Sequence, residues 1–172
     1  MHHDGPLGHV SVDPPATAAG GVLSRTAFRA TFNNVRLAIE RAMESLAPVN
    51  LSPEDLSSIE LILAEALNNV VEHAYPPGQP GNVKMVLRHV RSGVMIEIRD
   101  TGKPMPEGRT PLGLHPQEKR PEDKLPEGGY GWYLIRQLAR DVVYDRENGE
   151  NFLFFRVAVG GTATAYPASE TD

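Results

Sequence analysis

The spacing of hydrophobic and polar residues changes twice in the first half of the chain. Residues 21–28, GVLSRTAF, read as a first strand, whereas residues 32–48 place apolar side chains three and four positions apart, which predicts an amphipathic helix. A second helix is predicted from Ser52 to Ala74. Ser52 is a typical N-cap, proline and acidic residues follow it in the first turn, and the Pro-Pro-Gly of residues 76–78 ends the pattern.

Two alternating segments follow the second helix. Residues 82–90 and 93–100 are joined by a short polar turn, so they predict an antiparallel hairpin with Met85, Leu87 and Met95 on one face.

The rest of the chain predicts a loop, a helix and a second hairpin. Six prolines between Gly102 and Gly129 exclude a long helix or a central strand there, so a long loop is expected. Residues 128–140 resume a helical period after a run of glycines, and residues 141–147 and 151–159 alternate as strands around an Asn-Gly turn.

The order of these elements predicts an α+β fold. We expect a two-layer α/β sandwich, with the helices packed on one face of a mixed, mainly antiparallel sheet. The domain is expected to span residues 21–159, with residues 1–20 and 160–172 as disordered tails, because both ends are irregular and lack periodicity.

Composition narrows the class of protein. A chain of 172 residues with 40% hydrophobic and 23% charged residues suits one globular domain, and a net charge of −5 argues against sequence-independent binding to nucleic acid or to an anionic membrane. The sequence has no cysteine, which excludes disulfides, thiolate catalysis and Cys-ligated zinc. The chain also shows neither a secretory signal nor a run near ~18 apolar residues, so we expect a cytoplasmic protein.

The second predicted helix carries polar residues at a spacing of four. Glu65, Asn69 and His73 lie one turn apart and form a stripe along the edge of the apolar face, with His73 nearest the apolar centre. Such a row is either a set of satisfied structural hydrogen bonds or the wall of a pocket, and the helix alone does not decide between them.

Two further features have the chemistry of a nucleotide pocket when they are combined with this stripe. Asp100, at the end of a strand, can accept a hydrogen bond from an exocyclic amine, and Gly102 lets a flat ring approach the backbone. Gly129 and Gly131 leave amide N–H groups at a helix N-terminus for phosphates, and the oxygen of Asn69 suits Mg²⁺. Each feature alone has a common structural explanation, such as a turn or a bend.

Three motifs resemble the ATP-binding boxes of a known superfamily. EALNN with HAY in residues 65–75, DTGKP in residues 100–104 and GGYGWYLI in residues 128–135 are similar to the N, G1 and G2 boxes of the Bergerat-type ATPases. That superfamily includes gyrase, mismatch-repair proteins and the catalytic domains of histidine kinases. The strongest resemblance is to the anti-sigma factor serine/threonine kinases, and it covers residues 21–159.

The resemblance implies a Bergerat fold that binds ATP and Mg²⁺ and assigns roles to single residues. Asn69 would ligate the Mg²⁺, Asp100 would bind the adenine amino group, Gly102 would pack near the ring, and Gly129 and Gly131 would shape the phosphate end.

For catalysis, the resemblance makes Glu65 the general base that takes a proton from a serine or threonine hydroxyl. For His73 it favours a structural role. The loop of about residues 103–128 would be a lid over the nucleotide, whose γ-phosphate ligand is not singled out among its basic residues: Lys103, Arg109, Lys119, Arg120 and Lys124. The implied partners are an anti-sigma factor antagonist-like substrate, a sigma factor and a second copy of the chain.

The chain departs from the family pattern before the last strand. Many relatives have Gly-Thr where this sequence reads Gly149-Glu150-Asn151, so a hydroxyl contact on the adenine side is missing or replaced.

Three functions are compatible with these motifs. The leading hypothesis is an ATP-dependent protein serine/threonine kinase in a partner-switching circuit. The second is a nucleotide-responsive binding module with negligible kinase activity. The third is the detached catalytic domain of a two-component histidine kinase, which would need a phosphoacceptor histidine from a separate chain.

Overall fold

The computed structural model describes residues 21–113 and 129–160. Its helices and strands follow in this order: β1 (Val22–Arg29), α1 (Phe32–Leu46), η1 (Ala47–Val49), α2 (Pro53–Asn69), η2 (Val70–Ala74), β2 (Asn82–Val90), β3 (Gly93–Asp100), η3 (Pro106–Gly108), α3 (Gly129–Leu138), β4 (Ala139–Glu147) and β5 (Glu150–Val157). None of the helices in these two ranges is both long and apolar enough to cross a membrane.

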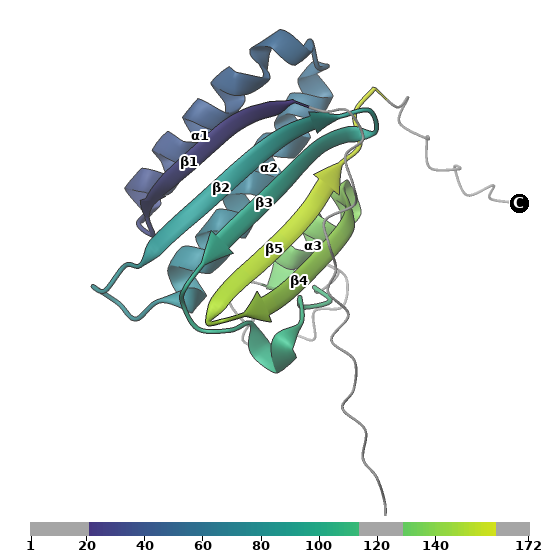
Figure 1. Ribbon diagram of the computed structural model, residues 1–172. Coiled ribbons are helices and arrows are strands. Elements are labelled where there is room, and N and C mark those ends of the chain that lie inside the picture. Colours follow the sequence, from purple (N-terminus) through teal and green to yellow (C-terminus); the bar gives the residue numbers. More distant parts are fainter. Residues whose placement is uncertain (1–20, 114–128, 161–172) are drawn as a thin grey trace, which may run out of the picture.

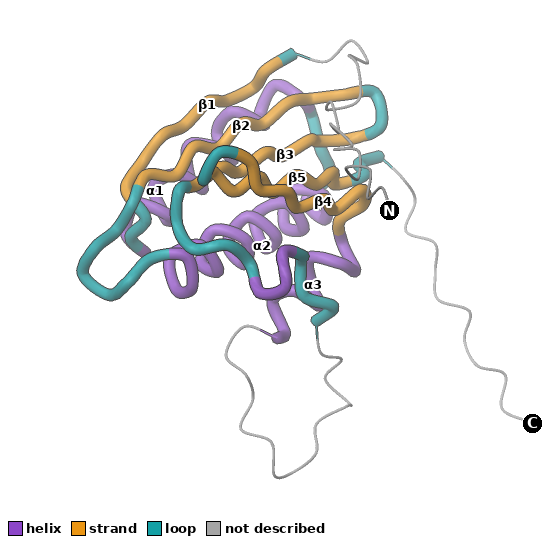
Figure 2. Tube along the Cα trace, turned by 60° about the horizontal axis from the view of Figure 1, so that its bottom comes forward, coloured by secondary structure: helices purple, strands orange, loops and turns teal. Residues whose placement is uncertain are grey.

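The strands form one sheet in the order β1-β2-β3-β5-β4, in which every neighbouring pair is antiparallel. The helices α1, α2 and α3 lie behind this sheet in Figure 1, and Figure 2 shows the sheet and the helices as separate layers. The predicted two-layer α+β fold is therefore confirmed, and its described strands are entirely antiparallel rather than mixed. β5, the last strand of the chain, lies between β3 and β4 and is therefore a direct neighbour of β3.

The core lies between the two layers. Its fully buried large side chains come from both: Leu46, Ile59, Ile62, Leu63, Leu67, Val83, Met85, Leu87, Ile96, Ile98, Ile135 and Phe155. The expectation that Met95 shares a face with Leu87 is wrong. Leu87 pairs with Ile96, whereas Met95 pairs with Arg88. Residues directly opposite each other in an antiparallel pair share a face, so Met95 lies on the face of the sheet away from the helices.

The predicted start of the second helix is confirmed by its cap. The Ser52 hydroxyl oxygen accepts a hydrogen bond from the backbone N–H of Asp55 at 3.1 Å, and Pro53 occupies the first helical turn. The helix ends differently from a regular α-helix, because Val70–Ala74 form a π turn. A π turn holds more residues than an α turn, so side chains after Asn69 lie at different angles from those that a regular helix predicts.

The third helix ends earlier than its apolar period suggests. α3 stops at Leu138, and Ala139 already pairs with Val157 as the first residue of β4. The expectation that the helix continues to residue 140 is therefore wrong by two residues. Pairing with β5 overrides the helical pattern at this end.

Candidate functional site

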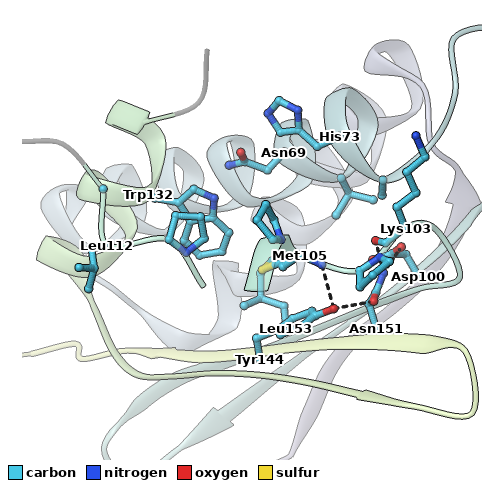
Figure 3. Close-up of a pocket in the computed structure, with 16 residues that line it drawn as sticks. Asn69, His73, Asp100, Lys103, Met105, Leu112, Trp132, Tyr144, Asn151 and Leu153 are labelled. Atoms are coloured by element: carbon cyan, nitrogen blue, oxygen red, sulfur yellow. Dashed lines mark hydrogen bonds between the residues drawn. The ribbon is translucent and has the colours of Figure 1, made fainter. Parts of the chain in front are cut away.

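A cavity of about 680 Å³ lies where η2, the end of β3, the following loop, α3 and β5 meet (Figure 3). This volume is in the range of small-molecule sites, which is roughly 300–1,000 Å³. Its lining residues come from these segments, from the last residue of α2 and from β4: Asn69, Val70, His73, Ala74, Asp100, Lys103, Pro104, Met105, Pro106, Pro111, Leu112, Gly113, Trp132, Tyr144, Asn151 and Leu153. The cavity therefore combines an apolar wall with a few polar groups.

Asn69 and Asp100, both predicted from the sequence, line this one cavity. Figure 3 shows Asn69 on the helical wall and Asp100 on the wall formed by the sheet. The Asn69 Nδ2 donates to the backbone carbonyl of Glu65 at 2.7 Å, which fixes the carboxamide. Its oxygen is then the atom that can accept a donor or ligate a cation.

Glu65 and Gly131 lie beside Asn69 and contact each other. A Cβ atom on Gly131 would overlap Oε2 of Glu65 and would lie 3.6 Å from Nδ2 of Asn69. The first turn of α3 therefore approaches the polar stripe of α2 so closely that a side chain at residue 131 would displace the Glu65 carboxylate from its position. Gly129, the first residue of α3, belongs to the same turn.

Gly102 has a packing reason for being glycine. A Cβ atom there would lie 2.5 Å from the carbonyl oxygen of Ala74 and 2.6 Å from its Cβ. The neighbouring Lys103 N–H donates to the same carbonyl at 2.7 Å. The loop after β3 is thus attached to the end of η2, and a contact between Gly102 and a bound ring remains a prediction.

The Asp100 carboxylate is buried at the sheet end of the cavity, with 6% of the residue exposed. Its Oδ1 accepts hydrogen bonds from the backbone N–H of Gly102 at 2.8 Å and from Nδ2 of Asn151 at 2.9 Å. Burial is the largest influence on this carboxyl group and raises its pKa above the ordinary value. The two hydrogen bonds lower the pKa, as does the charge of Arg146, whereas the charge of Glu150 raises it.

Asn151 and Tyr144 are site residues that the sequence did not assign. Strand register places Asn151 opposite Asp100 on one side and opposite Arg146 on the other. The Tyr144 hydroxyl donates to Oδ1 of Asn151 at 2.7 Å and accepts from the backbone N–H of Met105 at 3.0 Å. The sequence signal at this end of the site was the departure at Gly149-Glu150-Asn151 from the Gly-Thr of many relatives, and the Asn151 amide provides a hydrogen bond to Asp100 there.

His73 is more exposed than the helical wheel indicated. Its side chain is 50% exposed, and its Nε2 lies 3.8 Å from a carboxylate oxygen of Glu72. The expectation that His73 is the stripe residue nearest the apolar centre is wrong, because the π turn of η2 changes the angle at which it leaves the helix. His73 still lines the cavity.

Part of the predicted lid is described. Residues 103–113 close one side of the cavity, and Arg136 of α3 holds them by donating to the carbonyl of Pro111 at 2.8 Å and that of Thr110 at 3.1 Å. Residues 114–128 lie outside the described part of the chain. Of the basic lid residues, Lys103 lines the cavity and Arg109 pairs with Glu107.

Within residues 21–113 and 129–160, the structure has no group of three or more histidine or acidic side chains that could hold a metal ion. A cation at Asn69 would therefore need oxygen atoms from a bound ligand or water. Mg²⁺ commonly binds in this way, because it keeps several waters and takes oxygens from substrate phosphates.

The fold and these motifs agree with a known family. The histidine kinase-like ATPase domain matches residues 28–157, which is most of the chain, so the chain belongs to this family. It is 32% identical over 114 residues to the serine/threonine-protein kinase BtrW of Bordetella bronchiseptica, covering 66% of this chain and 72% of that protein.

A second relative and a solved structure agree with this family. The serine-protein kinase RsbW of Oceanobacillus iheyensis is 30% identical over 104 residues, covering 59% of this chain and 65% of that protein, which is just under two thirds of its length. A crystal structure of RsbU and RsbW domains from Mycobacterium tuberculosis superposes with a TM-score of 0.51 at 16% identity. That match covers 79% of this chain and 32% of the solved chain, and it shows a shared fold.

Proposed function

We propose that this chain is an ATP-dependent protein serine/threonine kinase that phosphorylates an anti-sigma factor antagonist-like protein in a partner-switching circuit. The observation that carries the proposal is that Asn69 and Asp100 line the same cavity, with Glu65 one helical turn from Asn69 and against Gly131. The kinase names of the two relatives support the reaction class.

The chemistry of the cavity fits an adenine nucleotide. Asp100 presents a buried acceptor to an exocyclic amine, and the side chains of Met105, Trp132 and Leu153 provide apolar surface for a flat ring. The N–H groups of the first turn of α3 would face the phosphates. The Asn69 oxygen would hold Mg²⁺ together with phosphate oxygens, and the ion would neutralise phosphate charge.

Glu65 is the proposed general base. Its carboxylate lies on the same face of α2 as Asn69 and borders the first turn of α3, so it would be close to the phosphate end of the nucleotide. There it would orient the hydroxyl of a substrate serine or threonine and accept its proton. Gly131 leaves room for that carboxylate, because any side chain at this position would displace it.

The partners extend this proposal. A sigma factor would be a second binding partner, a second copy of the chain would complete a homodimer, and the protein would act in the cytoplasm. These proposals rest on the resemblance to anti-sigma factor kinases.

Binding and catalysis can be separated on α2. Asn69→Ala is expected to abolish binding of Mg·ATP in calorimetry, because it removes the ligand oxygen. Glu65→Ala should retain that binding and lose phosphotransfer. Asn68→Ala is the matched control, since Asn68 is next in sequence and leaves the helix in another direction. Unchanged affinity in Asn69→Ala would refute the metal assignment.

The type of phosphotransfer distinguishes the three hypotheses. Incubation with labelled ATP and a candidate antagonist protein should give an acid-stable label on serine or threonine. Nucleotide binding without any label would indicate a nucleotide-responsive binding module. An acid-labile label on a histidine of another protein would indicate the catalytic domain of a histidine kinase.

A further inference from the structure

We propose that Asn151 is a positioning residue that keeps Asp100 a hydrogen-bond acceptor and so makes the site select a base with an amino group at this position. Tyr144 holds Asn151 in the required orientation. The inference rests on the proposed nucleotide site and extends it to base selectivity and to the pH range of binding.

The surroundings of Asn151 fix which end of its amide faces Asp100. On one side, its Oδ1 accepts from the Tyr144 hydroxyl at 2.7 Å and from the guanidinium of Arg146, which can only donate. On the other side, its Nδ2 donates to Oδ1 of Asp100 at 2.9 Å and to the carbonyl of Lys103 at 3.0 Å, which can only accept. A flipped amide would place donor against donor and acceptor against acceptor.

This fixed donor determines where Asp100 can carry a proton. Its Oδ1 already accepts from Asn151 and from the Gly102 N–H, so a proton would have to sit on Oδ2. An ionised Asp100 accepts a hydrogen bond from an amino group such as that of adenine. A protonated Asp100 would instead donate from Oδ2 and would favour a carbonyl oxygen, as in hypoxanthine or guanine.

The hydrogen bond from Asn151 to Asp100 is important because both residues are buried. Asn151 is 4% exposed and Asp100 is 6% exposed, so water does not readily replace a lost hydrogen bond. The hydrogen bond from Asn151 is the largest of the influences that lower the Asp100 pKa against burial. The charges of Arg146 of β4 and Glu150 of β5 act on Asp100, and the other titratable groups that line the cavity with it are His73 of η2, Lys103 of the loop and Tyr144 of β4.

Tyr144 connects this base end to the loop that closes the cavity. The same hydroxyl that donates to Asn151 accepts from the backbone N–H of Met105, as the dashed lines in Figure 3 mark. Removing that hydroxyl would take one hydrogen bond from the Asn151 amide and one from the Met105 backbone.

Asn151→Thr and Asn151→Val form a matched pair of test variants, because the two side chains have the same shape and only threonine has a hydroxyl donor. The first measurement is the Asp100 pKa in the ligand-free protein, from the carboxyl carbon shift in NMR. We expect a higher pKa in Asn151→Val than in the wild-type protein, and a value closer to wild type in Asn151→Thr. Equal pKa values in both variants would overturn the inference.

The second measurement is the affinity ratio of ATP to inosine triphosphate, by calorimetry over a range of pH. Asn151→Val should lower this ratio by about tenfold, the equivalent of one hydrogen bond, and should lose ATP binding at a higher pH as the solution is acidified. Asn151→Thr should retain most of the preference. Equal ratios and pH profiles in Thr and Val would contradict the proposed selectivity.

Tyr144→Phe provides the test if Asn151→Val does not fold. This variant keeps the ring and removes the hydroxyl. It should raise the Asp100 pKa, by a smaller amount than Asn151→Val. An unchanged pKa would count against the inference. If the wild-type protein binds neither nucleotide, the proposed function fails, whereas the titration of ligand-free Asp100 still decides whether Asn151 positions it.

Discussion

Gly131 of α3 faces the carboxylate of Glu65 on α2 so closely that a Cβ atom would overlap Oε2 and would lie 3.2 Å from Cδ. These residues are far apart in sequence and belong to two different motifs. Their contact joins the polar stripe of α2 to the glycine-rich start of α3. The missing side chain at residue 131 therefore leaves space for the proposed general base.

Gly131→Ala should change activity more than stability. The overlapping atom is the end of a flexible side chain, so Glu65 can move away, and alanine favours the helix by about 1 kcal/mol. We expect an unfolding free energy within about 1 kcal/mol of wild type and a loss of phosphotransfer of up to about 100-fold, since a displacement near 1 Å can cost that much. Single-turnover kinetics and urea unfolding measure the two effects.

A double variant tests whether Gly131 acts through Glu65. Combining Gly131→Ala with Glu65→Ala should reduce phosphotransfer no further than Glu65→Ala alone. Additive losses would mean that Gly131 affects the reaction by another route.

Gly102→Ala should destabilise the fold. The new Cβ would lie 2.5 Å from the Ala74 carbonyl oxygen, and this atom belongs to the backbone, which cannot move as freely as a side-chain end. We expect a loss of about 1–3 kcal/mol in the unfolding free energy, measured by urea denaturation. Gly21→Ala is the control, because a Cβ there meets no atom within 4 Å. Equal stability of the two variants would disprove the packing argument.

Tyr75→Phe should weaken the junction between η2 and the ends of β2 and β3. The Tyr75 hydroxyl accepts from the Thr101 N–H at 3.0 Å and donates to the Asn82 carbonyl at 3.1 Å. Losing both hydrogen bonds should lower the unfolding free energy by about 1–2 kcal/mol. Tyr130→Phe, at a tyrosine that is 51% exposed, should change it by less than about 0.5 kcal/mol. Similar stabilities of the two variants would show that the Tyr75 hydrogen bonds contribute nothing net.

Asp100→Asn should change how stability depends on pH. Because the folded protein raises the pKa of Asp100 above 3.8, the native state binds its proton more tightly than the unfolded state does. That contribution to stability is complete below the unfolded pKa and is lost as the pH rises through the folded pKa. The variant has no carboxyl group at this position and so does not lose this contribution. The difference in unfolding free energy, variant minus wild type, should therefore increase as the pH rises from the unfolded to the folded pKa of Asp100, by at most about 1.4 kcal/mol per pH unit. Urea unfolding at several pH values measures the difference, and a constant difference would contradict the raised pKa.

Local patterns predicted most of the secondary structure. The cap at Ser52, the hairpin around residues 91–92 and the helical period of α1 depend on neighbours within a few positions, so they can be read from the sequence. The π turn of η2 could not be predicted in this way, because nothing in a 3.6-residue period distinguishes a wider turn. That turn is the reason why the predicted position of His73 was wrong.

The residues of the site also divide into those that the sequence identified and those that it did not. The motifs identified Asn69 and Asp100, which line the cavity, and Glu65 and Gly131, which contact each other beside it. Tyr144 and Asn151 were not assigned, because their relation to Asp100 depends on which strand lies beside β3.

The sequence by itself determined most of the helices and strands, the layer that each helix joins and the residues with nucleotide-binding chemistry, because periodicity, capping and motif spacing are local properties. Only the tertiary structure decided that β5 lies between β3 and β4, in a register that places Asn151 opposite Asp100. Strand order and register follow from contacts between residues distant in the chain, which bury one face of the sheet under the helices. The hydrogen bond from Asn151 to the Asp100 carboxylate is therefore a consequence of the fold, whereas the one from the Gly102 N–H comes from only two residues along the chain.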